Sequence, residues 1–209
     1  MAGDSQTTWG TGKSWSTNKM TEIKHPFGRA LVAESGAEIT SRKAVDYLVT
    51  LAGDKQLYEQ NSLPGLAAMA IKKVRDDLRR QQFECSSEEV QKFIENEGLE
   101  CALMMVNYED APKIDTIQLT IGVPNRAKSF FEVVGSGSDL AAYLLTDLCE
   151  PEMDRETASV IAVHVIEIAK RHDPYCGGPV KLGILTLGQE PASHLLAQFT
   201  LTPADVAPP

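Results

Sequence analysis

The side chains in this sequence best suited to metal or redox chemistry are its four cysteines and four histidines, but their spacing argues against either role. The cysteines contain no CxxC pair, and the histidines share no ligand spacing with one another or with a cysteine. Structural zinc sites usually take their ligands from such short repeats. The residues concerned are Cys85, Cys101, Cys149, Cys176, His25, His164, His172 and His194. The sequence therefore predicts reduced thiols, no metal ion and no other cofactor.

Hydroxyl, carboxylate and ammonium groups gather instead in a few short polar stretches. Read locally, Asp4 fits an Asx turn, Lys19 fits a surface lysine, and Asp173-Pro174 fits the start of a turn. Gly135–Ser138 (GSGS) fits a helix-start turn with Ser138 as its N-cap. A phosphate-binding loop is disfavoured there, because the lysine of the GxxxxGK[ST] pattern is absent.

Composition limits the classes of protein to which the chain can belong. The 209 residues are 43% apolar and 23% charged, which suits one domain with a sizeable core. We expect that domain to span residues 1–201 and a flexible Pro-rich tail to occupy 202–209. No apolar run is long enough to cross a membrane, and residues 1–15 lack the apolar centre of a secretion signal. A cytoplasmic location is therefore expected.

Charge argues against polyanionic partners. The net charge of −9 disfavours both nucleic acid and an anionic membrane surface. A single basic cluster, interrupted by Asp76 and Asp77, is interpreted as the solvated face of a helix. It consists of Lys72, Lys73, Arg75, Arg79 and Arg80.

Hydrophobic periodicity predicts blocks of helices and blocks of strands, hence sheets packed with flanking helices. A first helix is expected around Ala44–Gly53, and a second begins at Pro64 and carries the apolar stripe Ala67, Ile71, Val74 and Leu78. A third is expected from the Ser86/Glu89 capping box to Gly98. Two later helices are expected at 140–149 and 157–171. Strands are expected at 29–33, 99–106, 117–121, 130–134, 180–187 and 195–201. His164 lies on the most apolar helix and is expected to be a core histidine.

Three stretches in series resemble the proteasome-type branch of the N-terminal-nucleophile (Ntn) hydrolases. They are Gly3-Asp-Ser-Gln-Thr-Thr8 with Asn18-Lys-Met-Thr-Glu-Ile23, Val134-Gly-Ser-Gly-Ser138 leading into a helix, and Ala169-Lys-Arg-His-Asp-Pro-Tyr-Cys-Gly-Gly178 leading into a strand. The resemblance implies an α+β fold, a four-layer αββα sandwich, and assembly into stacked rings. In this family a chain-leading Thr, Ser or Cys attacks an amide, with its own α-amine as the base.

The resemblance also implies roles for individual residues. Lys19 matches the lysine whose charge lowers the pKa of the nucleophile, and Asp4 matches the acidic residue that orients it. Ser136 matches the serine that hydrogen-bonds the terminal amine, and Asp173 matches the aspartate that orients this serine. Cys176 stands where the family usually has serine, so its hydrogen bond is expected to be weaker.

The sequence departs from the family pattern at two places. Glu34 stands where a glycine amide usually donates to the oxyanion, and a carboxylate there is unfavourable. Asp4 is only three residues after Met1, so the strand that carries the nucleophile is expected to be missing. The supporting residues are present, whereas no position matches the nucleophile itself.

Three functions remain open at this point. The chain is a threonine-type hydrolase or peptidase read without its first strand, its true start lying upstream. Alternatively, it is a non-catalytic ring or assembly subunit, or an amidase of the same fold that acts on a non-peptide amide. All three predict self-association or pairing with homologous subunits, and only the first and third predict a peptide or amide substrate.

Overall fold

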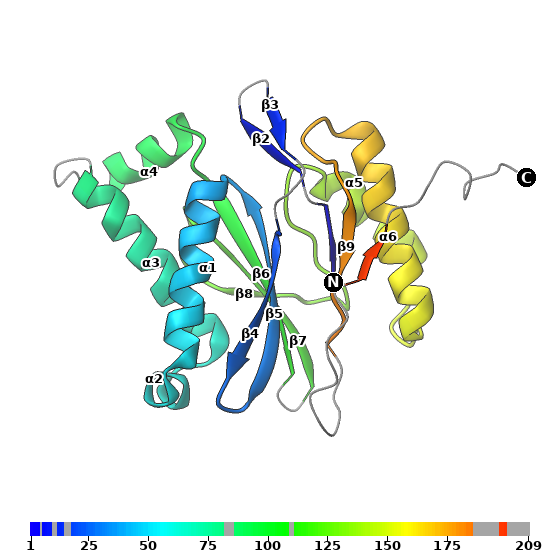
Figure 1. Ribbon diagram of the computed structural model, residues 1–209, viewed down its shortest axis with the longest axis horizontal. Coiled ribbons are helices and arrows are strands. Elements are labelled where there is room, and N and C mark those ends of the chain that lie inside the picture. Colours follow the sequence, from blue (N-terminus) through cyan, green and yellow to red (C-terminus); the bar gives the residue numbers. More distant parts are fainter. Residues whose placement is uncertain are drawn as a thin grey trace, which may run out of the picture. The chain divides into compact units, whose positions relative to one another are not determined.

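The computed structural model describes residues 1–4, 6–9, 12–14, 18–81, 86–108, 111–185 and 197–199. The chain divides into two compact units. Unit 1 contains Met1–Lys19 and Ser136–Pro209, and unit 2 contains Met20–Gly135 (Figure 1). A single domain over 1–201 stays a prediction, and the predicted tail at 202–209 lies outside the described residues.

Unit 2 is built on a five-stranded antiparallel sheet with strand order β4-β5-β6-β7-β8. The strands are β4 (Met20–His25), β5 (Gly28–Gly36), β6 (Cys101–Tyr108), β7 (Pro112–Gln118) and β8 (Asn125–Arg126). The central strands carry continuous apolar runs, and β5 is buried from Ala30 to Glu34. This confirms the predicted strands at 29–33 and 99–106, of which the second was expected to be covered on both faces.

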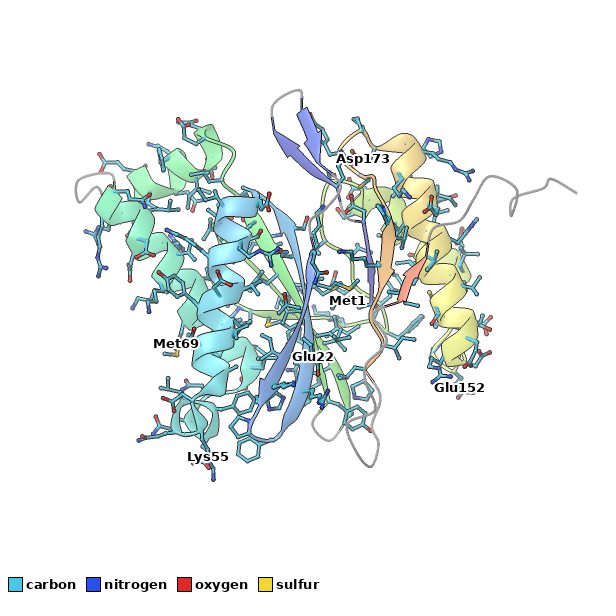
Figure 2. The ribbon with its side chains drawn as sticks, in the orientation of Figure 1. Met1, Glu22, Lys55, Met69, Glu152 and Asp173 are labelled. Atoms are coloured by element: carbon cyan, nitrogen blue, oxygen red, sulfur yellow. The ribbon has the colours of Figure 1, made fainter. Side chains whose placement is uncertain are left out.

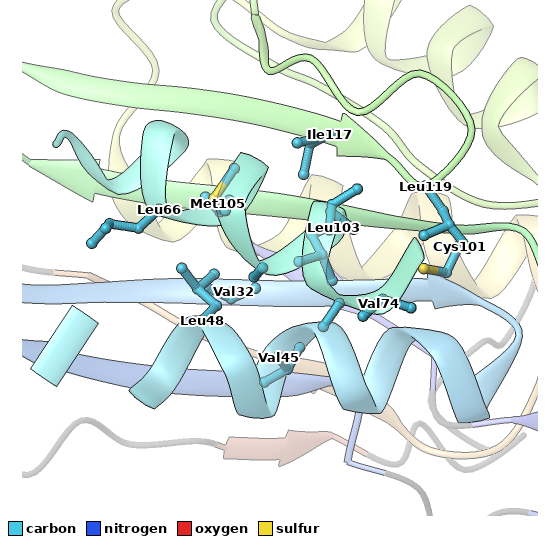
Figure 3. Packing of buried hydrophobic residues seen from close by; sticks show 14 of the residues in the cluster. Val32, Val45, Leu48, Leu66, Val74, Cys101, Leu103, Met105, Ile117 and Leu119 are labelled. Atoms are coloured by element: carbon cyan, nitrogen blue, oxygen red, sulfur yellow. The ribbon is translucent and has the colours of Figure 1, made fainter. Parts of the chain in front are cut away.

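Helices cover this sheet and close the core of unit 2. They are α1 (Glu38–Gly53), α2 (Lys55–Gln60), α3 (Leu63–Gln81) and α4 (Ser87–Asn96). Leu48 of α1 and Leu66 of α3 pack against Leu103 and Met105 of β6, all four fully or almost fully buried (Figure 3). The predicted stripe on α3 is buried throughout, and the capping box of Ser86 and Glu89 forms as expected.

Unit 1 has a three-stranded antiparallel sheet with strand order β1-β9-β10, and its helices are α5 and α6. The elements are β1 (Ala2–Gly3), a hairpin of β2 (Thr7–Trp9) and β3 (Gly12–Ser14), α5 (Ser138–Leu148), α6 (Arg155–His172), β9 (Val180–Leu182) and β10 (Ala197–Phe199). Helix α6 contacts β1, β9 and α5, and it buries Val163, Val165 and Ala169. Both late helices were predicted, as were strands at β9 and β10.

Four expectations are corrected. No strand forms at 130–134, where the chain takes bends and irregular structure ahead of Gly135. Strand β7 ends at Gln118, so Ile121 falls in the following turn and is 61% exposed. His164 is exposed because it lies on the face of α6 that also exposes Val160 and Arg171, whereas Val163, Val165 and Ala169 are buried on the other sides of the helix. A short strand, β1, does precede Asp4 and pairs with β9, although no strand was expected there.

The periodicity also missed several elements. Strand β4 lies in a stretch interpreted only as part of a polar motif, and helix α2 is too short to show a periodic pattern. No helix within the described ranges is long and apolar enough to cross a membrane.

The end of β5 gives a stability prediction. Gly36 has φ of 93°, and a Cβ there would collide with the carbonyl oxygen of Glu100 and lie 2.8 Å from Cys101 Cα. We expect Gly36→Ala to destabilise the protein by about 2 kcal/mol or more. Gly53→Ala is the matched control, since open space surrounds that position at the end of α1, and we expect it to be neutral or slightly stabilising. Urea unfolding of both variants measures the difference, and equal losses would contradict the prediction.

Candidate functional site

Asp4 is the centre of the polar cluster. It follows β1 directly, and both of its carboxylate oxygens are used. Lys19 Nζ donates to Oδ1 at 2.8 Å, and the backbone amide of Gly177 donates to Oδ2 at 2.8 Å. One side chain thus joins the start of unit 1 to Lys19 and to the turn at Gly177, which is distant in the sequence. These contacts give Asp4 a long-range role that its local interpretation as an Asx-turn residue did not include.

The Lys19–Asp4 ion pair is largely shielded from water. Only 21% of the Lys19 side chain and 13% of the Asp4 side chain are exposed. Breaking a shielded pair leaves one charge without compensation, which costs more than breaking a surface pair. The ammonium of Lys19 is therefore held at a defined place, unlike that of an ordinary surface lysine.

The segment after α6 forms a tight turn around Asp173 (Figure 2). The Asp173 amide donates to Ala169 O at 2.7 Å and closes the helix, while the Tyr175 amide donates to Asp173 Oδ1 at 2.8 Å. The Cys176 thiol donates to Asp173 Oδ2 at 3.5 Å. The expected turn at Asp173-Pro174 is confirmed, and it orients the thiol as well as the carboxylate.

Ser136 joins this turn from the segment ahead of α5. Its Oγ lies 3.9 Å from Cys176 Sγ, and Ser136 is exposed to solvent. The following Gly137 permits the close approach, because a Cβ there would lie 3.2 Å from Cys176 Sγ and 3.3 Å from Ala169 Cβ. Asp4, Lys19, Ser136, Asp173 and Cys176 thus form one continuous set of contacts, completed by the Gly177 amide.

The pKa values of Asp173 and Cys176, both in this turn, are shifted in opposite directions. Burial would raise the pKa of the Asp173 carboxyl, but hydrogen bonds from Ser136, the Tyr175 amide and Cys176 outweigh it, so the pKa is lowered. Burial, followed by the charges of Asp4 and Asp173, raises the pKa of the Cys176 thiol to about 11. At neutral pH Asp173 is ionised and Cys176 is protonated, so Cys176 is a poor nucleophile.

Gln6 is a member of this region that the sequence analysis missed. It is 2% exposed, and its Nε2 donates to the carbonyl oxygen of Pro174 at 2.9 Å. With the Asp4–Gly177 contact, this hydrogen bond fixes the 173–177 turn from two sides. The signal available in the sequence was weak: a glutamine two residues after Asp4 in a polar stretch.

Glu34, which stands where the family pattern has an oxyanion-donating glycine, lies in unit 2. Its side chain is only 3% exposed, and Arg42 Nη2 lies 2.7 Å from its Oε1. The guanidinium compensates the buried charge. Glu34 is therefore one half of an ion pair between β5 and α1.

Within the part of the chain that is described, no three His, Cys, Asp or Glu side chains are arranged to hold a metal ion. The five clustered residues offer a fixed ammonium, two carboxylates, a hydroxyl and a thiol. The carboxylate beside Ser136 is that of Asp173, and it is a weak base because its pKa is lowered. It would therefore remove a proton from the Ser136 hydroxyl poorly. The arrangement can stabilise and orient a reacting group, but it includes no activated nucleophile of its own.

Comparison with known proteins supports the fold. No protein-family model and no curated protein matches this sequence. The structure matches that of Anbu (ancestral beta-subunit) from Yersinia bercovieri with a TM-score of 0.64 and 15% identity, covering 86% of this chain and 74% of that chain. At this identity the likeness shows the fold alone. The α+β fold of the proteasome β-subunit type, inferred from three short stretches, is confirmed.

The thiol of Cys176 allows the electrostatics of the cluster to be measured. With a pKa of about 11, we expect alkylation by iodoacetamide at pH 8 to be about 100-fold slower than for a free cysteine and to rise with pH. Asp173→Asn removes a carboxylate that disfavours the thiolate, so it should lower this pKa and speed alkylation. Peptide mapping by mass spectrometry resolves Cys176 from the other cysteines.

Asp147→Asn is the control, because Asp147 is an exposed carboxylate near the opposite end of α5. It should leave the alkylation profile of Cys176 unchanged. A wild-type thiol with an ordinary pKa, or equal profiles for the two variants, would show that the cluster does not act on Cys176 as described.

Proposed function

We propose that this chain is a proteasome-like Ntn hydrolase, and that Asp4, Lys19, Ser136, Asp173 and Cys176 support the nucleophile. The observation that carries the proposal is the shielded Lys19–Asp4 pair, linked through Gly177 to the Ser136–Cys176–Asp173 network. An ordinary surface lysine is not expected to pair with a largely shielded carboxylate that also binds the backbone of a distant turn. The fold likeness to an ancestral β-subunit agrees with this assignment.

The chemistry follows from the charges. The Lys19 ammonium beside a chain-leading Thr, Ser or Cys would favour its ionised form and stabilise negative charge that develops during attack on an amide. Asp4 keeps that ammonium in place. Ser136 and Asp173 would hold the α-amine that serves as the base, and the weak thiol donor of Cys176 would contribute less than a serine.

The sheet topology of unit 1 suggests where the strand that would carry the nucleophile could add. Among the strands that the structure describes, β1 lies at the edge of its sheet, with only β9 as a partner. An open edge accepts another strand through backbone hydrogen bonds. We propose that a nucleophile-bearing strand adds at this edge, directly beside Asp4, and that the complete fold is the four-layer αββα sandwich.

The second candidate is a non-catalytic subunit of a proteasome-like ring or assembly. It is favoured by the protonated Cys176 and by Glu34, which stands where an oxyanion-donating glycine is usual. Hydrolysis of a non-peptide amide is the third candidate, since a fold does not fix its substrate. Each candidate retains self-association and a cytoplasmic location as predictions.

Expression of the chain with the residues that its gene encodes ahead of Met1 tests the first candidate. We expect self-processing to expose a Thr, Ser or Cys and the product to hydrolyse fluorogenic peptides or simple amides. Lys19→Ala should then lower kcat by about 100-fold or more, because the stabilising charge is lost. Intact-mass measurement identifies the processed N-terminus.

Lys170→Ala is the matched control. Lys170 is 19% exposed and pairs with Glu167 on α6 in the same unit, so both substitutions remove a half-buried ion pair. Loss of activity in both variants would mean that Lys19 matters only for stability. A folded, longer protein without any hydrolysis would rule out the enzyme and favour the non-catalytic subunit.

A further inference from the structure

The basic cluster on α3 is more than a solvated helix face. Lys72, Arg75 and Arg79 line a groove of about 440 Å³ between α3, α4 and the turn that follows β7. Apolar Met69 and Ile121 share the lining, at 39% and 61% exposure, and Asp76 is the one carboxylate among the lining residues that the structure describes. Met69 is labelled on α3 in Figure 2. The groove thus combines an excess of positive charge with exposed apolar side chains.

Two cations of the groove are available to a partner. Arg80 pairs with Asp77 at 3.9 Å, and Lys73 lies 4.4 Å from the ring centroid of Tyr47, so their charges are engaged locally. Lys72 and Arg75 form no ion pair within the described residues, and Arg75 donates only to the carbonyl oxygen of Thr120 at 3.3 Å. They are one helical turn apart on α3 and can reach two neighbouring carboxylates.

The turn between α5 and α6 presents the complementary groups. Glu150 and Glu152 flank Pro151, both are exposed, and neither has an ion pair within the described part of the chain (Glu152 is labelled in Figure 2). The neighbouring Asp154 is occupied, because it caps α6 by accepting from the Thr157 amide at 2.8 Å. Pro151 fixes the backbone between the two glutamates, which lowers the entropy lost on binding.

Apolar residues flank this turn as well. Leu148, at the end of α5, is 39% exposed, and Met153 is half-buried. An acidic turn with apolar flanks matches a basic groove with apolar walls. A net charge of −9 argues against nucleic acid, since the whole chain would repel the phosphate backbone.

We propose that the α3–α4 groove binds the Glu150–Asp154 turn of a second copy of this chain. The groove lies in unit 2 and the turn in unit 1, so the contact joins different surfaces of two copies. Such a heterologous contact repeats from copy to copy and produces a ring where the rotation closes. The inference rests on the self-association proposed above and assigns its contact residues.

Sedimentation velocity at low and high salt tests this contact. We expect wild-type association that weakens as salt rises, because the charges are solvent-accessible. Lys72→Glu and Glu152→Lys each place like charges opposite one another and should weaken association by about tenfold or more. The double variant Lys72→Glu/Glu152→Lys restores opposite charges and should recover most of the loss.

Lys24→Glu and Glu97→Lys are the matched controls, since both are exposed residues of unit 2 away from the groove lining. They make the same charge changes and should leave association unchanged. Far-UV circular dichroism verifies that each variant is folded. Glu150→Lys provides a second test of the turn, independent of Glu152.

The outcomes separate this inference from the proposed function. A monomeric wild-type chain overturns self-association and the contact together. An oligomer indifferent to Lys72→Glu and Glu152→Lys, or single losses without recovery in the double variant, overturns only the contact. Binding of duplex DNA that Lys72→Glu abolishes, without any change in association, also overturns it. None of these outcomes bears on hydrolysis.

Discussion

The polar cluster depends on the carboxylate of Asp4. Its two oxygens accept hydrogen bonds from Lys19 and from the Gly177 amide, each at 2.8 Å. An asparagine would offer one acceptor oxygen and a donor amide in place of two acceptors, so one of the two partners would lose its hydrogen bond. The ammonium and the turn after α6 are therefore held by the same group. A change in either should be felt by the other.

The turn after α6 shows how a short sequence arranges several groups at once. Asp173 ends the helix with its amide, fixes Tyr175 with Oδ1 and receives the Cys176 thiol with Oδ2. Gln6 holds the carbonyl oxygen of the intervening Pro174. Because each of these hydrogen bonds restrains a different atom, the thiol has little freedom to move. The position of Cys176 is therefore set both by its neighbours and by its own hydrogen bonds to Asp173.

Sequence reasoning succeeded where a local pattern has a single physical meaning. The stripe Ala67–Leu78 and the capping box at Ser86 each imply one structure, and both form. It failed at 130–134, where an apolar run resembles a strand but pairs with none of the strands that the structure describes. It also failed for His164, because apolar composition on every side of α6 does not say which face the sheet covers. The pairing partners are set by contacts distant in sequence, which periodicity does not carry.

The candidate site shows the same limit. Asp4 and Lys19 look like loop and surface residues in their local context, and only the family resemblance predicted roles for them together. The basic cluster shows the converse, since its pattern suits a solvated helix face, whereas Lys72, Arg75 and Arg79 line a groove together with α4 and the turn after β7. Neither a shared carboxylate nor a groove is visible in the composition of one segment. Such sites become predictable from sequence only when their several segments are considered together.

The charge balance of the cluster bears on what it can receive. Asp4 and Asp173 contribute two negative charges, Lys19 contributes one positive charge, and Cys176 stays protonated because its pKa is about 11. The five residues therefore carry one negative charge in excess, in partly shielded surroundings where uncompensated charge is costly. A cationic group such as the α-ammonium of a chain-leading residue would balance it. A second anion, such as a substrate carboxylate placed at the same point, would add to the negative charge. The charge of the cluster therefore favours an amine beside Ser136 and Asp173.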